Sequence, residues 1–179
     1  MFRKMGIILS DFFSTVKKIE IVDLLIIPGF ITIIIYLFFN SNIRDLSKFI
    51  GEFNDIVINI TSLLAAFGLA SLSILATSSS ENISVAKERF TNRTDRSKKL
   101  ITYYQLLVLR NFYSLFLQLT LLIISVLNKF IIETNNNKIT LYLEVYLLIC
   151  SIFAQIFVVN SMYFLFINPK KNDNKNNDE

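Results

Sequence analysis

Residues 56–77 read IVINITSLLAAFGLASLSILAT, and this stretch decides the fold class. It carries no charged residue over 22 positions. At about 1.5 Å per residue, a helix of this length crosses a hydrocarbon core of about 30 Å. The apolar residues are continuous and do not alternate with a period of two, as strands of a membrane barrel would require. We therefore predict a transmembrane helix.

Small and polar side chains recur every three or four positions on one face of this helix and at its ends. Lipid tails give no reason to expose hydroxyls, so this row should face protein or water. Close helix packing is one explanation, because small residues let two backbones approach; a wet path through an oligomer is the other. We call this row the polar stripe, and its members are Asp55, Asn59, Ser62, Ala66, Ala70, Ser73 and Thr77.

Three further segments are long and apolar enough to span a bilayer: 21–39, 106–127 and 139–167. The sequence thus predicts an all-α, polytopic membrane protein with four transmembrane helices in residues 21–167. Residues 1–20 form an amphipathic pattern, with one apolar and one basic face, which favours an interfacial helix on the membrane surface. The alternative is a helix packed on the loop at 78–101. The Asn- and Lys-rich tail, 168–179, is typical of disorder.

Basic residues are distributed unevenly between the two sides of these spans. Four Lys or Arg residues lie in 1–20, six in 78–101 and three in the tail, against two in each of the opposite connections. Short loops rich in Lys and Arg stay in the cytoplasm. We therefore expect both termini on the cytoplasmic side of a bacterial inner membrane.

Several polar side chains fall within or beside the predicted spans. Amides in hydrocarbon are normally hydrogen-bonded across helices, so we expect the second, third and fourth helices to share a polar interior. We predict that Asp23 pairs with Arg110, although Arg110 could also reach lipid phosphates. Glu144 could bind Gln118 or Asn59, line an ion pathway in an oligomer, or reach the interface. The intramembrane polar set is Asp23, Arg110, Asn111, Gln118, Glu144 and Gln155.

The loop 78–101 is the largest exposed feature. Ser78 and Glu81 have the spacing of a capping box, which predicts a helix over about 82–93. Its basic residues favour binding to anionic lipid headgroups, and docking of a cytoplasmic partner protein or a nucleotide signal is the alternative. These candidate docking residues are Lys87, Arg89, Arg93, Arg96, Lys98 and Lys99.

The composition excludes several classes of function. The chain is 53% hydrophobic and 18% charged, with no histidine, one cysteine and four glycines. Histidine-based catalysis, zinc sites and glycine-rich phosphate loops are therefore excluded. The spans carry hydroxyls and amides without a base beside any hydroxyl. We expect no enzyme activity, no cofactor, no metal and no direct contact with nucleic acid.

The stretch Ala66-Phe67-Gly68-Leu69-Ala70-Ser71, followed by Ser78-Ser79-Ser80-Glu81 in an N-in, four-span chain, resembles the bacterial four-helix membrane proteins of anti-phage defence operons. The membrane subunit of the Kiwa system belongs to that group. The resemblance implies a tetramer and a cytoplasmic partner from the same operon. It carries over no functional residue.

Three functions fit these observations. The first is a homo-oligomeric defence effector that permeabilises the inner membrane. The second is a non-conducting membrane anchor or sensor that docks a cytoplasmic partner. The third is a holin-like lysis protein, although four spans are unusual for one.

Overall fold

The computed structural model describes residues 2–39, 46–131 and 138–167, and its helices confirm the predicted all-α class. Within these residues, four stretches are long and apolar enough to cross a membrane: Lys18–Phe38, Lys48–Thr77, Tyr103–Phe130 and Lys138–Tyr163. The chain is therefore a multi-pass membrane protein by the length and composition of its helices. The predicted disordered tail, 168–179, lies outside the described residues.

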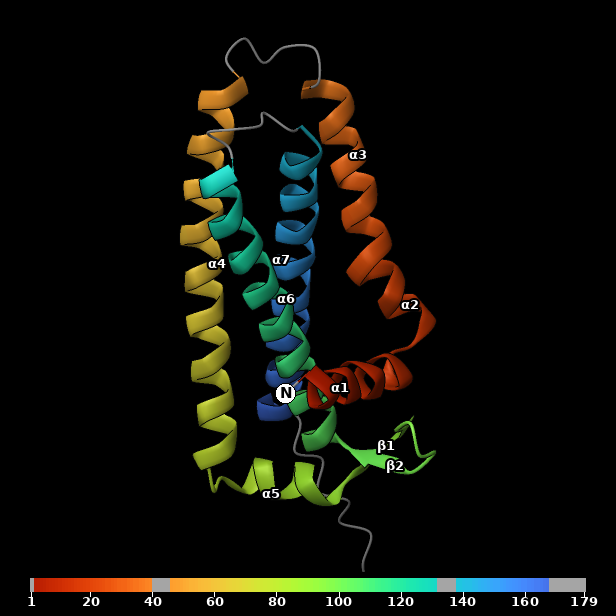
Figure 1. Ribbon diagram of the computed structural model, residues 1–179. Helices are drawn as coiled ribbons and strands as arrows, with labels where there is room; N and C mark the ends of the chain where they lie inside the picture. Colours follow the sequence, from red (N-terminus) through yellow and green to blue (C-terminus); the bar gives the residue numbers. More distant parts are fainter. Residues whose placement is uncertain (1, 40–45, 132–137, 168–179) are drawn as a thin grey trace, which may run out of the picture.

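Three long helices form the centre of the bundle. These are α4 (Leu46–Thr77), α6 (Tyr103–Ile131) and α7 (Lys138–Ile167), and each packs against the other two (Figure 1). Gly68 lets α4 approach α6 closely, because a Cβ atom there would come within 2.8 Å of Leu115 Cδ2. The absence of a side chain at this position therefore sets how near the two helices can lie.

The first span runs along the outside of the bundle. It comprises α2 (Lys18–Ile21), a π-helical turn η1 (Val22–Ile26) and α3 (Ile27–Phe39), and α3 packs against α7. The π-helical turn comes immediately before Pro28, which cannot donate a backbone hydrogen bond and whose ring crowds the preceding turn. Phe30 and Leu37 are 65% and 69% exposed, as expected for side chains in contact with lipid.

The remaining elements gather at one end of the bundle. They are α1 (Phe2–Thr15), α5 (Glu81–Glu88), β1 (Phe90–Thr94) and β2 (Leu100–Thr102). Figure 1 shows α1 running across the bundle axis at this end, with α5 and the antiparallel pair β1–β2 beside it. Most of the described Lys and Arg residues lie on these elements and their links, so we call this the basic end.

The two faces of α1 have different surroundings. Phe12 is 1% exposed, and its ring stacks on Tyr113 of α6 with centroids 3.8 Å apart. α1 packs on α6 and also contacts β1, which lies in the loop 78–101. Ile7 remains 43% exposed and Phe13 45%, although the Phe13 ring also meets Tyr113 edge-on with centroids 5.8 Å apart. Both residues therefore keep apolar surface that a membrane surface could cover.

The helix predicted over 82–93 is wrong beyond Glu88. Residues 90–94, Phe-Thr-Asn-Arg-Thr, form β1 instead, because β-branched and aromatic side chains favour a strand. Thr91 Oγ1 donates to the carbonyl of Ile101 across the pair at 2.8 Å. The predicted capping box is also wrong: Ser80, and not Ser78, is the N-cap of α5, and its side chain makes no capping bond.

Candidate functional site

The interior of the bundle is polar and closely packed. Asn111 donates to Ser71 Oγ, and Gln118 Nε2 donates to Gln155 Oε1 at 2.9 Å. Asn111 and Gln118 are fully buried, and Gln155 is 5% exposed. The buried polar residues of α4 are Asn54, Thr61 and Ser71, so members of the polar stripe take no part in this interior.

Glu144 lies in the same interior, near the end of the bundle opposite the basic end. It is 1% exposed, and its Oε1 accepts a hydrogen bond from Asn128 Nδ2 at 2.7 Å. Neither predicted partner is correct. Gln118 is already bonded to Gln155, and Asn59 lies on the exposed face of α4. Glu144 is therefore held by a neighbour on α6, which excludes the prediction that it reaches the interface.

The polar stripe faces away from the rest of the chain. All seven of its residues are exposed in this single copy, so the described parts of the chain leave the stripe uncovered. Ser62 Oγ donates to the carbonyl of Ile58, and Thr77 Oγ1 donates to that of Ser73. These hydroxyls are therefore satisfied by their own helix. At the end of the stripe away from the basic end, Asp55 pairs with Lys129 at 2.6 Å.

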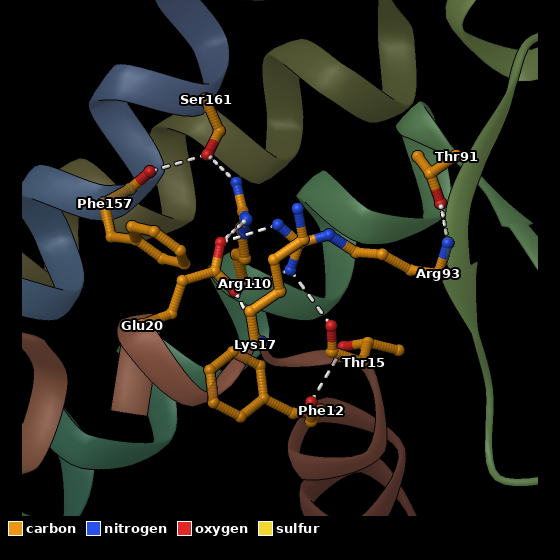
Figure 2. A network of polar contacts seen from close by, with 9 residues as sticks. All are labelled: Phe12, Thr15, Lys17, Glu20, Thr91, Arg93, Arg110, Phe157 and Ser161. Atoms are coloured by element: carbon orange, nitrogen blue, oxygen red, sulfur yellow. Dashed lines mark hydrogen bonds and ion pairs between the residues drawn. The ribbon is translucent and has the colours of Figure 1, made fainter. Parts of the chain in front are cut away.

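A network of ion pairs and side-chain hydrogen bonds joins four elements, α2, β1, α6 and α7, at the basic end, and a bond to a backbone carbonyl connects it to α1 (Figure 2). Glu20 Oε1 accepts hydrogen bonds from Arg93 Nη2 at 2.6 Å and from Arg110 Nη2 at 2.8 Å. Its other oxygen accepts from Arg93 Nη1 at 2.6 Å and from the backbone N–H of Lys17 at 2.9 Å. Arg93 Nη1 also donates to the carbonyl of Thr15. The three ionised side chains are only 11–14% exposed.

Arg110 is held on two further sides. Its Nη1 donates to Ser161 Oγ, which in turn donates to the carbonyl of Phe157. The guanidinium carbon also lies 3.9 Å from the centroid of the Phe157 ring, a cation–π contact. The network therefore fixes α7 as well as α2, β1 and α6.

The predicted pair Asp23–Arg110 is wrong, because Glu20 takes the place of Asp23. Leu24 and Tyr113 belong to one buried cluster, together with Phe12 and Ala154. Moving one helical turn back from both residues brings Glu20 to Arg110. Asp23 is exposed on the outer side of the span.

The same network borders a cavity of about 630 Å³. Its polar wall includes Lys17, Arg89, Arg93 and Arg110, with Glu20 as the single carboxylate among the lining residues. Its apolar wall is built from α5, α6 and α7: Val85, Ala86, Leu106, Leu107 and Phe157. Cavities of this volume hold small organic ligands, so this is the candidate functional site.

The six basic residues predicted as one docking surface have three different environments. Arg93 is in the buried network. Lys87 and Arg89 lie over the rings of Tyr104 and Tyr103, at 5.1 Å and 5.5 Å from the centroids. The remaining three are exposed at the turn between the strands: Arg96, Lys98 and Lys99. Lys87 and Arg89 are exposed as well, so Arg93 alone of the six is withdrawn from the open basic surface.

The sequence pattern did not single out Glu20. It sits at the start of the first span beside Lys17 and Lys18, where it looks like one of several interfacial charges. Its distinguishing property is that it is buried, whereas Asp23 three positions later is exposed. That property becomes visible only once α1 and β1 are placed around it.

No cluster of three or more potential metal ligands occurs within the residues that the structure describes. Cys150 is free and buried in α7. The arrangement offers cations, amides and apolar surface at the basic end. Comparison with known proteins adds no assignment, since no family model, no curated protein and no solved structure matches this chain.

Proposed function

We propose that the chain is the membrane subunit of a bacterial defence system, with its basic end in the cytoplasm, and that it acts there as a non-conducting anchor or sensor for a partner protein. The orientation is supported by the excess of Lys and Arg in 1–20, 78–101 and 168–179. The elements described in the first two of these segments lie at one end of the bundle (Figure 1). The defence setting is supported by the resemblance to the four-helix membrane proteins of anti-phage operons.

The observation that carries this proposal is the Glu20–Arg93–Arg110 network. Charged residues at a membrane surface are normally solvated, yet these three are mostly buried and join four elements. Such a network turns two segments far apart in the chain into one rigid platform. The turn residues Arg96, Lys98 and Lys99 project from that platform as an exposed basic surface for a partner.

The centre of the bundle supports a non-conducting role for a single copy. A channel wall presents polar groups to water, whereas Asn111 and Gln118 are fully buried and bonded to neighbouring helices. The polar side chains inside the bundle therefore act as packing contacts between helices.

The orientation is tested by labelling introduced cysteines in intact cells with a membrane-impermeant maleimide. Native Cys150 is 1% exposed and should give a low background. We expect Lys98→Cys to react only after the membrane is opened. Glu52→Cys, at the opposite end, should react in intact cells. The reverse pattern would refute the proposed topology.

Docking is tested by co-purifying the products of neighbouring genes with the full-length protein. Lys98→Glu with Lys99→Glu should abolish co-purification. Lys48→Glu with Lys138→Glu makes the same change of charge at the opposite end and should have no effect. Unchanged co-purification with the first double variant would contradict docking at the basic end.

A second candidate function is the permeabilising homo-oligomer, with a tetramer as the state that the resemblance implies. It is favoured by the outward position of the polar stripe, which only another copy, lipid or water could cover. Small side chains at Ala66 and Ala70 would allow close contact between copies. The bonds from Ser62 and Thr77 to their own backbone favour a packing face over a water-lined wall.

Liposome experiments separate the two candidates. The anchor or sensor predicts no ion flux from purified protein, whereas the effector predicts flux. With flux present, Ser62→Leu and Ala66→Leu should abolish it and leave the oligomer intact if the stripe lines a pore. The same variants should dissociate the oligomer if the stripe is a packing face. A monomer without flux would refute the second candidate.

A further inference from the structure

We propose that the cavity at the basic end is a binding site for a phosphate ester, held through its phosphate by the cationic wall and through its remainder by the apolar wall. This goes beyond the proposed function, because ligand binding can fail while the topology and the partner docking hold. The shared chemistry could come from an anionic phospholipid headgroup or from a soluble nucleotide.

The first argument is the charge of the cavity wall. Lys17, Arg89, Arg93 and Arg110 line it, against the single carboxylate of Glu20, which leaves an excess of three positive charges. Glu20 cannot compensate further, because both of its oxygens already accept two hydrogen bonds each. Arg93 and Arg110 are largely buried and share the one carboxylate, whereas Lys17 and Arg89 are exposed beside them. The summed positive field of these four side chains attracts an anion to the cavity. A phosphate supplies that anion.

The second argument is the supply of hydrogen-bond donors. A guanidinium has five N–H donors, and Arg110 uses two of them, to Ser161 and Glu20, within the described parts of the chain. Its position is nevertheless fixed by those bonds and by Phe157. A cation that is immobilised by some of its donors and keeps the others is preorganised for an oxyanion.

The third argument concerns Arg89, which lines the cavity from the end of α5. Its guanidinium lies 5.5 Å from the ring centroid of Tyr103, and both residues border the cavity. The cation–π contact places this charge at the wall without neutralising it. Arg89 and Lys17 are therefore cations whose removal leaves the bonds to Glu20 intact, since Lys17 contributes only its backbone N–H to that network.

The apolar wall determines the class of anion. Val85, Tyr103 and Phe157 lie on three different helices, border the same cavity as the cations and keep apolar surface exposed, whereas Leu106 and Leu107 are buried. A bare inorganic ion would leave this surface wet, whereas an ester of phosphate would cover it. The volume of about 630 Å³ is of the size that accommodates a nucleotide or a lipid headgroup with its glycerol.

The test uses full-length protein in phosphatidylcholine nanodiscs, with two arms. In the lipid arm, phosphatidylglycerol is included in the discs, and retained lipid is measured by native mass spectrometry. In the nucleotide arm, ATP is titrated into pure phosphatidylcholine discs, and the dissociation constant is measured by calorimetry. Binding in either arm supports the phosphate-ester site, and the arm that responds identifies the source.

The test variant is Lys17→Gln with Arg89→Gln. We expect it to weaken the binding seen with the wild type roughly tenfold or more, because charge-assisted hydrogen bonds to phosphate are lost. The control, Arg96→Gln with Lys99→Gln, removes the same charge from residues that do not line the cavity and should bind like the wild type. Absence of binding in both arms would overturn the proposal. So would an equal loss in the two double variants, because binding would then depend on general surface charge.

Discussion

The two ends of the bundle each carry an ion pair with a separation of 2.6 Å, in opposite environments. At the basic end, the side chains of Arg93 and Glu20 are 14% and 11% exposed. At the other end, those of Lys129 and Asp55 are 60% and 56% exposed. The first pair belongs to a network that joins four elements, whereas the second links only α4 and α6.

The difference shows that the distance between two charges does not by itself determine how much an ion pair stabilises the protein. Water around Lys129 and Asp55 already solvates both charges, so pairing them adds little stability. Glu20 has lost most of its water, and its removal would leave two guanidinium groups buried without a counter-ion. A single substitution in the network at the basic end should therefore lower the stability of the protein substantially, whereas a substitution in the pair at the opposite end should have little effect.

Glu20→Gln should have the largest effect of the four changes considered. It leaves Arg93 and Arg110 without a counter-ion, and we expect a loss of about 3 kcal/mol in the free energy of unfolding. Chemical unfolding in mixed micelles measures this loss. A change no larger than that of Asp55→Asn would show that the two ends do not differ.

Arg93→Lys sharpens the comparison because it keeps the positive charge and removes the planar guanidinium group. A lysine cannot bind both oxygens of Glu20 and the carbonyl of Thr15 in the same geometry. We expect a loss of about 2 kcal/mol, measured in the same unfolding experiment. Full stability in this variant would mean that charge alone holds the platform.

Gln155→Leu tests a buried, uncharged contact, whose expected effect on stability lies between those of the two ion pairs. It removes the acceptor used by both Ser114 and Gln118. Hydrogen bonds between membrane helices contribute modestly, so a loss of about 1 kcal/mol is expected. Ile156→Leu, at an exposed neighbouring position, is the matched control and should leave the unfolding free energy unchanged.

Asp55→Asn should have the smallest effect, about 0.5 kcal/mol or less. Raising the salt concentration should remove even this difference, because exposed charges are screened over about 10 Å at 0.1 M salt. The loss caused by Glu20→Gln should persist in high salt. Equal salt sensitivity of the two variants would contradict the burial argument.

The four spans could be predicted from the sequence because each one is decided by its own residues. About 20 apolar residues in lipid have one good solution, a helix. The predicted 56–77 and 106–127 fall inside α4 and α6. The helix predicted over 82–93 was partly wrong because this loop lies outside hydrocarbon, where strands are also possible. The residues from Phe90 to Thr94 favour a strand, and they pair with β2.

The partners of the polar residues could not be predicted in the same way. Asp23 and Glu20 are both carboxylates near the start of the first span, and either could have met Arg110. In the folded chain, Glu20 points inward to Arg110 and Asp23 is exposed. Likewise, the sequence does not distinguish Asn128 from Gln118 as the hydrogen-bond partner of Glu144. In the structure, Gln118 binds Gln155 and Asn128 binds Glu144.

The sequence by itself determined that this is an all-α, multi-pass chain, where its spans lie and which segments carry the basic charge, since hydrocarbon imposes those constraints one segment at a time. Only the tertiary structure decided that Glu20, Arg93 and Arg110 meet beside a cavity and that the polar stripe faces outward. Glu20 is 73 positions from Arg93 and 90 from Arg110. Contacts over such separations depend on the register between helices, which no local pattern of residues encodes.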